Sequence, residues 1–435
     1  MQQETLCGNI SVDENGQLLF AGKNTIDLAK KYGTPLYLID ENMIRENIRT
    51  YIDAMKKYYS ADSFPCFASK ALSFKQIYRI IKEENAGIDV VSSGELYTAL
   101  KAGFPLEKAF FHGNNKTEFD IEFAMDNSIG YFVVDNFWEL DCIEAKAKEK
   151  GIVQKVLLRI TPGIDSHTLE AINTGKVDSK FGCAIETGQA EEIAKYALGL
   201  SNVKLCGYHC HIGSQIFESK PFIDAAKIML NFIVDIKEKY GYSAEILNLG
   251  GGFASRYLDS DETVDYAEII KEIGRYLNET CENLGLDKPV IIHEPGRSIV
   301  ASAGMTLYTV GTIKEIPGFK NYVSIDGGMA DNPRYALYSA EYTCLSANNP
   351  SGEKDYKCSI AGRCCESGDM IAENIMLQKV KSGDILAVCT TGAYNYSMSS
   401  NYNRLPKPPV VMINEKEDYI AVKRETFDDI IRNDI

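Results

Sequence analysis

The sequence predicts an α/β protein: a (β/α)8 barrel of the TIM type, followed by an all-β C-terminal domain that also takes in the N-terminal strands. Two observations lead to this fold class. From residue 64 onward, short apolar strands alternate with amphipathic helical segments, and the first strand starts recur about every 21 to 25 residues, as in β/α units. After residue 302 the chain changes to short β-type segments with little helical pattern.

Eight strands are expected in the barrel, each followed by a helix or a long connection. Their predicted ranges are 64–69, 88–91, 109–112, 131–134, 156–160, 204–209, 246–249 and 290–293. Helices are predicted between them, for example over 136–150 and 225–240. A doubly wound open sheet is the alternative, but no G-x-G-x-x-G motif follows the first strand, which weakens it.

The ends of the chain carry β-type patterns. Short strands are expected within 7–40, with a turn at Asn15-Gly16, and a closed barrel leaves the strands of 7–22 no partner. We therefore expect them to join the C-terminal domain. The later predicted strands are 305–310, 322–325, 357–361, 384–390, 410–413 and 419–422. The predicted domains are 1–40 (N-terminal strands), 41–300 (barrel) and 301–435 (β domain).

Composition narrows the function classes. The 435 residues carry a net charge of -15, which disfavours nucleic acid and anionic membranes as general partners. No basic and apolar leader and no run of about 18 apolar residues is visible, so we expect no signal peptide and no membrane span. The 12 cysteines form no C-x-x-C pair. We expect them to be reduced thiols in a cytoplasmic protein.

The segment Phe64-Pro-Cys-Phe-Ala-Ser-Lys-Ala71 is an apolar strand that ends in a lysine. In a barrel, Lys70 would lie at the C-terminal mouth, where catalytic residues gather. An amine at the end of an apolar strand loses solvation, which favours its neutral, nucleophilic form. Taken alone, a solvated lysine at a strand end is the simpler interpretation. The residues at the other strand ends must therefore distinguish a catalytic lysine from a solvated one.

Several of the other strand ends carry polar or glycine-rich segments. These are Ser92-Ser-Gly-Glu95, Gly113-Asn-Asn-Lys116, His211-Ile-Gly-Ser214, Gly250-Gly-Gly252 and Glu294-Pro-Gly-Arg297. Consecutive glycines after a strand let backbone N–H groups approach a phosphate. A flexible turn explains three glycines equally well, but their place before Glu-Pro-Gly-Arg favours a phosphate cup.

Two residue types at the mouth indicate the kind of ligand. His209 and His211 share one face of an extended segment, but no third and fourth ligand follows at metal-site spacing, so we expect no metal and favour a ring platform for a planar cofactor. Glu294 could hold a proton on a pyridine nitrogen, so that the ring accepts an electron pair. A Ser-His-Asp triad is disfavoured because no G-x-S-x-G motif is present.

The C-terminal domain adds three candidate segments. Arg334 and Tyr338 are four residues apart, so one turn of helix would place them on one side, and arginine suits a carboxylate. Cys364-Cys-Glu-Ser-Gly-Asp369 places a thiol beside a carboxylate, and Tyr394 follows a predicted strand. Taken singly, Cys365 and Tyr394 are better explained by packing.

As an ordered set these motifs resemble the diaminopimelate decarboxylases, pyridoxal-phosphate enzymes of fold type III whose alanine-racemase-like barrel is shared by the ornithine decarboxylases. The resemblance covers nearly the whole chain, and although no single motif is specific, the combination is. It rests on Ala68-Ser-Lys-Ala71, His211-Ile-Gly-Ser214, Gly250-Gly-Gly252, Glu294-Pro-Gly-Arg297, Asp326-Gly-Gly328 and Cys365-Glu-Ser-Gly-Asp369.

The resemblance implies a role for each matched residue. Lys70 would hold the cofactor covalently, His211 would face its ring, and Glu294 would hold the pyridine nitrogen. The other implied cofactor-binding residues are Asp89, Ser214, Gly251, Gly252, Gly296, Arg297 and Tyr394. The substrate-binding residues would be Arg297, Arg334, Tyr338, Glu366 and Tyr394, and the catalytic ones Lys70, His211 and Cys365. Cys365 and Glu366 would come from the partner subunit of a homodimer.

The implied reaction is decarboxylation of meso-2,6-diaminopimelate to L-lysine and CO2, the last step of lysine biosynthesis. Two departures bear on the substrate: Tyr335 stands where the family has proline after its arginine, and the 401–408 segment differs by about one position. The alternatives are a decarboxylase for D-lysine, D-ornithine or a polyamine precursor, a racemase, which Glu294 argues against, and a non-catalytic homologue, for which the second domain would be unnecessary.

Overall fold

The computed structural model describes residues 7–164 and 179–435, which group into two compact units. The barrel unit comprises residues 45–254 and 264–296, and the β unit comprises the described residues up to 44 together with 255–263 and 297–435. Residues 41–44, 255–263 and 297–300, which the sequence predicts to lie in the barrel domain, thus group with the β unit.

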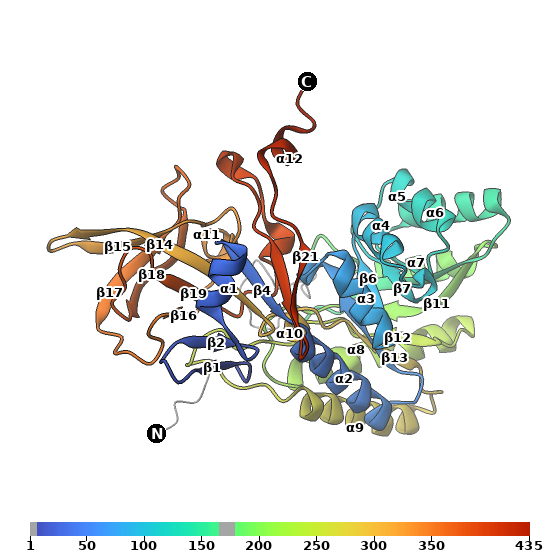
Figure 1. The fold of residues 1–435 in the computed structure, drawn as a ribbon. Coiled ribbons are helices and arrows are strands. Elements are labelled where there is room, and N and C mark those ends of the chain that lie inside the picture. Colours follow the sequence, from blue (N-terminus) through green and yellow to red (C-terminus); the bar gives the residue numbers. More distant parts are fainter. Residues whose placement is uncertain (1–6, 165–178) are drawn as a thin grey trace. The chain divides into compact units, whose positions relative to one another are not determined.

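The barrel unit is built on a closed parallel sheet (Figure 1). The strands follow the order β9-β11-β12-β13-β5-β6-β7-β8, and β8 pairs with β9 to close the ring. The predicted barrel is confirmed, and closure excludes the doubly wound open sheet. The strands are β5 (Phe64–Ala68), β6 (Gly87–Val90), β7 (Ala109–Phe111), β8 (Tyr131–Val134), β9 (Gln154–Thr161), β11 (Val203–His209), β12 (Ile246–Asn248) and β13 (Val290–His293), with β10 (Cys183–Ala184) beside β9.

One helix precedes the first barrel strand and the others fill the connections between these strands, and they lie outside the ring (Figure 1). They are α2 (Glu41–Tyr58), α3 (Lys75–Glu83), α4 (Ser93–Lys101), α5 (Glu118–Asp126), α6 (Phe137–Lys150), α7 (Gln189–Leu198), α8 (Lys220–Tyr240) and α9 (Tyr266–Leu284). Local chemistry sets their ends: the Asn136 side chain accepts from the Glu139 N–H at the start of α6, and Gly151 ends α6 with φ +65. The predicted start of α8, residue 225, lies five residues after the observed one, whereas the predicted end agrees.

The interior of the ring is a packed core with one apolar residue from each of seven strands. These residues are Cys66, Phe110, Val133, Leu157, Cys206, Ile246 and Ile292. Because side chains alternate along each strand, the same strands also send residues outward against the helices. The packed interior leaves the strand ends as the place for polar side chains.

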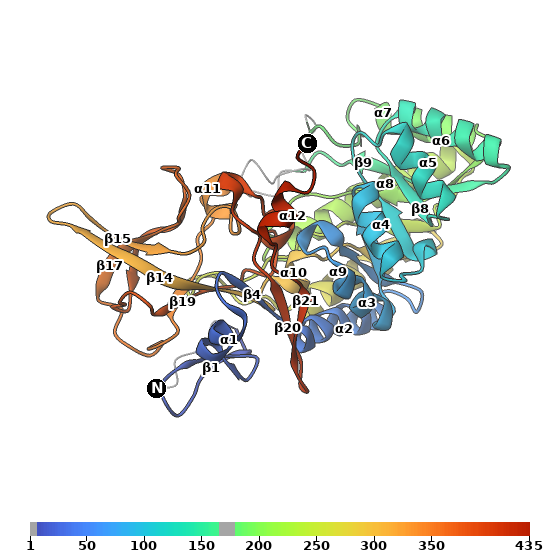
Figure 2. The same ribbon diagram turned by 45° about the horizontal axis from the view of Figure 1, so that its top comes forward.

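The β unit contains a three-stranded sheet and a larger mixed sheet (Figure 2). Its strands are β1 (Ile10–Val12), β2 (Leu18–Phe20), β3 (Lys23–Asn24), β4 (Leu36–Asp40), β14 (Gly304–Ile316), β15 (Lys320–Ile325), β16 (Cys344–Ser346), β17 (Tyr356–Ala361), β18 (Met370–Leu377), β19 (Ile385–Cys389), β20 (Val410–Ile413) and β21 (Asp418–Val422). Its helices are α1 (Thr25–Tyr32), α10 (Arg297–Val300), α11 (Arg334–Tyr338) and α12 (Phe427–Ile431).

The N-terminal segment belongs to this unit, as expected. Strand β4 pairs antiparallel with β14 and parallel with β20, and Leu18 and Phe20 share a buried core with Met305 and Val411. The sequence missed β16 and β18. Within the described ranges, no helix is both long and apolar enough to cross a membrane.

Candidate active site

Lys70 follows the first barrel strand directly. Strand β5 ends at Ala68, one residue earlier than predicted, and a 3-10 turn over Ser69–Ala71 carries the lysine with its side chain exposed. The Ala68 N–H donates to the Pro295 carbonyl at 3.2 Å, so the turn lies beside the Glu294-Pro-Gly segment after β13, in which Gly296 is buried. The sequence motifs at 70 and 294 therefore lie on neighbouring strand ends.

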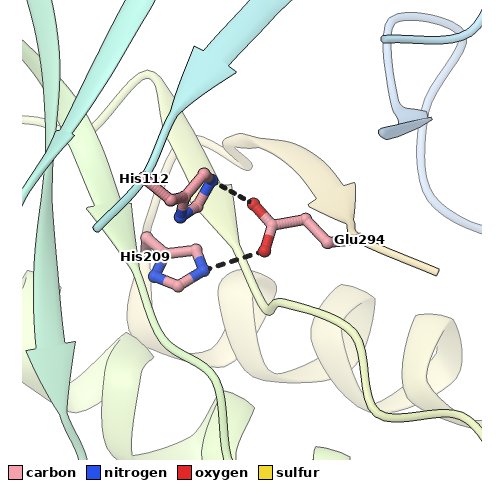
Figure 3. Close-up of side chains that lie close together, drawn as sticks. All are labelled: His112, His209 and Glu294. Carbon is pink, nitrogen blue, oxygen red and sulfur yellow. Dashed lines mark hydrogen bonds and ion pairs between the residues drawn. The ribbon is translucent and has the colours of Figure 1, made fainter. Parts of the chain in front are cut away.

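Glu294 lies at the centre of a buried polar cluster. Asn248 Nδ2 donates to Oε1 at 2.6 Å, His112 Nε2 lies 2.8 Å from the same oxygen, and His209 Nε2 lies 3.0 Å from Oε2 (Figure 3). Burial opposes ionisation, but the electrostatic and hydrogen-bond contacts with the two imidazoles outweigh it and hold the pKa of Glu294 well below its usual range. The carboxylate is thus ionised.

The cluster differs from the pair that the sequence suggested. His209 contacts both Glu294 and His112, and potential ligand atoms of these three residues lie within 4.8 Å of one another. Burial lowers the pKa of His209 to about 4, so its ring is neutral at neutral pH and donates one N–H to the carboxylate. The arrangement is that of a carboxylate oriented by imidazoles and an amide.

Two charged residues accompany this cluster. Asp89 in β6 is buried, and its Oδ1 has no hydrogen-bond partner among the described residues. Burial raises the pKa of Asp89, and the charges of His112, Lys70 and Arg159 act against that rise. Arg159 in β9 is buried, with its guanidinium 4.3 Å from the centre of the Phe181 ring. An orphaned carboxylate oxygen at a strand end can accept a hydrogen bond from a ligand.

The glycine loops after β11 and β12 pack against each other. A Cβ at Gly251 would lie 2.0 Å from the Glu294 carbonyl oxygen, and Gly252 has φ +114 with the Gly213 carbonyl oxygen 2.5 Å from its Cβ position. The Ile216 N–H donates to the Gly252 carbonyl at 3.0 Å, which fastens the two loops together. Only glycine fits here, so backbone groups can closely approach a ligand at these strand ends.

His211 and Ser214 belong to the first of these loops, where both are half-buried. Burial, followed by the charges of Lys70 and Arg159, lowers the pKa of His211 well below its usual range, so its ring is neutral. An ionised buried carboxylate, a neutral imidazole, an orphaned aspartate oxygen and backbone at close approach together fit a planar pyridine ring with a phosphate.

Two arginines define a second group, in the β unit. Arg297 begins α10 and Arg334 begins α11, and both are buried. Arg297 Nη1 donates to the Tyr257 hydroxyl at 2.7 Å and Arg334 Nη1 donates to the Tyr342 hydroxyl at 2.7 Å. The Tyr394 ring lies 4.9 Å from the Arg297 guanidinium. Each guanidinium is thus oriented by a phenol.

The predicted helical turn at 334–338 is confirmed as α11, with Arg334 buried and Tyr338 41% exposed at its far end. Cys365 and Glu366 lie exposed in the loop between β17 and β18. The Asp369 carboxylate accepts from the N–H groups of Met329 and Cys364, both at 2.6 Å, and Cys365 N–H donates to Asn403 Oδ1 at 2.8 Å. The loop backbone is therefore fixed while both side chains point outward.

Five residues of these groups were missed by the sequence analysis: His112, Arg159, Asn248, Tyr257 and Tyr342. His112 and Asn248 do carry a usable signal, since each is a polar residue at the end of a barrel strand. Tyr257 and Tyr342 carry none, because an isolated tyrosine outside a motif resembles any core residue.

Comparison with known proteins shows which protein family this chain resembles. Residues 44–301 match the family model for the pyridoxal-binding domain of pyridoxal-dependent decarboxylases. The chain is 45% identical over 432 residues to the diaminopimelate decarboxylase of Bacillus subtilis, covering 99% of this chain and 98% of the relative. It is 44% identical to that of Staphylococcus aureus over 430 residues, covering 98% and 99%.

A solved structure agrees with these relatives. The crystal structure of diaminopimelate decarboxylase from M. jannaschii in complex with L-lysine superimposes with a TM-score of 0.92 at 36% identity, covering 98% of each chain. With identity at this level over nearly the full length, the chain belongs to the diaminopimelate decarboxylase family of pyridoxal-dependent decarboxylases.

Proposed function

We propose that this enzyme removes the carboxylate at the D centre of meso-2,6-diaminopimelate, giving CO2 and L-lysine. The observation that carries the proposal is the pair of buried arginines in the β unit, Arg297 and Arg334, each oriented by a phenol rather than neutralised by it. After the reaction the L centre still carries an amine and a carboxylate. Two oriented guanidiniums suit a substrate that keeps a carboxylate away from the reacting carbon.

The residues of the barrel unit suit the cofactor. When bound, pyridoxal phosphate supplies a ring that accepts the electron pair left when the carbon–carboxylate bond breaks. We propose that Lys70 holds the cofactor through its amine and that Glu294 holds a proton at the pyridine nitrogen. His211 faces the ring, and Asp89 lies near it. Six further residues bind the phosphate and position the ring. They are Ser214, Gly251, Gly252, Gly296, Arg297 and Tyr394.

The substrate's two ends must be distinguished. Arg297, Arg334 and Tyr338 hold the distal carboxylate, Tyr394 contributes to the same binding, and Glu366 holds the distal amine. Buried polar groups left unpaired are costly, so a ligand without the distal carboxylate is rejected. Cys365 acts beside the reacting carbon. We propose that Cys365 and Glu366 reach the site from the partner subunit of a homodimer, which their exposure in a fixed loop supports.

We also propose a cytoplasmic location, since all twelve cysteines are free thiols, as expected in a reducing compartment. No second function is favoured. A racemase would not need an ionised glutamate at the ring nitrogen, because that residue favours electron withdrawal.

The test uses the purified holoenzyme and meso-diaminopimelate, with CO2 and amino acids measured together. We expect one CO2 for each L-lysine formed, and no D-lysine. The Lys70→Ala variant serves as the inactive control and should lose the absorbance of the bound cofactor. Absence of CO2 from the cofactor-loaded wild type, or release of an epimer of the substrate instead, would refute the proposal.

A further inference from the structure

We propose that Tyr257 is a positioning residue for carboxylate recognition: its phenol holds Arg297 and Arg334 in the arrangement with which they grip the substrate's distal carboxylate. This inference rests on the proposed function, and it assigns a role to a residue that belongs to none of the motifs. Tyr257 lies in 255–263, the short segment that groups with the β unit, as do both arginines.

The Tyr257 ring lies close to both guanidiniums. Arg297 Nη1 donates to its hydroxyl at 2.7 Å, and the Arg297 and Arg334 guanidinium carbons lie 5.7 Å and 4.9 Å from its ring centre. Tyr257 is 5% exposed, and both arginines are 7% exposed. A single aromatic side chain therefore contacts both cations in a site that excludes most water.

Tyr257 is itself firmly held. Its carbonyl oxygen accepts from the Thr343 hydroxyl at 2.9 Å, and its ring meets the Tyr342 ring edge-on at 5.5 Å. Tyr342 in turn accepts from Arg334 Nη1, and Asn395 Nδ2 donates to its hydroxyl at 3.3 Å. The position of Tyr257 is therefore set by backbone and ring contacts that do not depend on a ligand.

A phenol does what a carboxylate could not do here. Two buried guanidiniums repel each other, and an aromatic face with a hydroxyl acceptor offsets part of that repulsion. A glutamate in its place would neutralise the cations and compete with the substrate. Within 7–164 and 179–435, Arg334 forms no ion pair with a carboxylate, so the phenols orient its charge and leave it available.

Electrostatics agrees with this geometry. Burial alone would raise the pKa of Tyr257, but the charges of Arg297 and Arg334 outweigh burial and lower it. The two cations therefore favour negative charge on the hydroxyl oxygen that accepts from Arg297.

The test compares two ligands of the holoenzyme that differ by one carboxylate, L-lysine and 1,5-diaminopentane. The Tyr257→Phe variant keeps the ring and removes the acceptor. We expect it to weaken L-lysine binding and to raise the KM for meso-diaminopimelate about tenfold, the effect of losing one hydrogen bond to a charged group. The affinity for 1,5-diaminopentane and kcat should stay within about twofold.

Tyr356→Phe is the matched control, because it removes a phenol of the same unit whose hydroxyl contacts Glu315 at 3.0 Å. It should leave both affinities unchanged. If Tyr257→Phe does not fold, Thr343→Val, which removes the hydrogen bond to the Tyr257 carbonyl, should show the same selective loss at about threefold.

Three results in these variants would overturn the inference. They are an equal loss of affinity for both ligands, a fall in kcat with unchanged KM, and wild-type affinity for L-lysine. The ligand comparison needs no turnover. A wild type that binds L-lysine but releases no CO2 from meso-diaminopimelate would refute the proposed reaction while leaving the role of Tyr257 measurable.

Discussion

His209 Nε2 lies 3.0 Å from Glu294 Oε2, and both side chains are buried at the ends of barrel strands. Because burial keeps His209 neutral, the histidine gives the carboxylate a hydrogen bond without cancelling its charge. Glu294 thus stays ionised and fixed, which is the state required to hold a proton on a pyridine nitrogen.

The Glu294→Gln variant should therefore lose turnover far more than cofactor binding. The amide keeps the shape and the contact with Asn248 but cannot hold that proton, so we expect kcat to fall by a factor of about 10² or more. Cofactor affinity, measured by titrating the apoenzyme, should change much less. A variant with wild-type kcat would contradict the role of Glu294.

Buried His293 should make stability depend on pH. Its Nδ1 donates to the Gly250 carbonyl at 3.2 Å, and its Nε2 lies 2.9 Å from the Tyr59 hydroxyl. Burial lowers the pKa of His293 from 6.5 to about 4, so between these pH values the unfolded chain binds more protons than the folded one. Lowering the pH through this window therefore favours unfolding. The free energy of unfolding should fall by about 3 kcal/mol between its upper and lower ends.

Urea unfolding at pH 7 and pH 4.5 measures this effect. The His293→Gln variant should be less stable at pH 7 but should lose part of the pH dependence, since glutamine takes up no proton. An unchanged difference between the two pH values in the variant would show that His293 does not contribute.

Lys116 stabilises the folded barrel and takes no part in the proposed reaction. Its Nζ lies 2.6 Å from Glu139 Oε1, both side chains are 1% exposed, and the amine also donates to the Gly113 and Val133 carbonyls. Lys116→Met leaves Glu139 buried without its cation and should lower the free energy of unfolding by about 3 kcal/mol. In Lys146→Met, the matched control, only partly exposed contacts to Glu122 and Glu149 are lost, so the loss should stay below about 1 kcal/mol. Equal losses in the two variants would refute this assignment.

Shared active sites predict complementation between inactive chains. Lys70→Ala and Cys365→Ala should each be inactive, but if Cys365 serves the partner's site, a mixed dimer contains one intact site. Mixing the two with demonstrated subunit exchange should restore up to about a quarter of wild-type activity at equal amounts, because about half of randomly formed dimers are mixed. No recovery would indicate that each chain builds its own site.

The fold was largely predictable because its signals are local. Each barrel strand is a short apolar run before a helix, and strands β8 and β13 begin and end where the sequence predicted. Strand β16 has only three residues, and β18 runs through three buried residues before two exposed ones, so neither shows the alternation that marks a strand.

The candidate site was predictable where a residue follows a strand within a motif, as Lys70, His211 and Glu294 do. Contacts between distant residues were not. Asn248 and Glu294 are 46 positions apart and Tyr257 and Arg297 are 40 apart, and only folding brings each pair together. Periodicity describes a single element and carries no information about which side chains meet across the mouth.

The central claim, that the substrate is meso-diaminopimelate, is tested most directly by its kcat/KM relative to those of D-lysine, L-lysine and L-ornithine under identical conditions. With two arginines oriented for a distal carboxylate, we expect meso-diaminopimelate to be preferred by a factor of about 10³ or more, because the other three leave that charge-binding site unpaired. A higher kcat/KM for any of the other three would contradict the account.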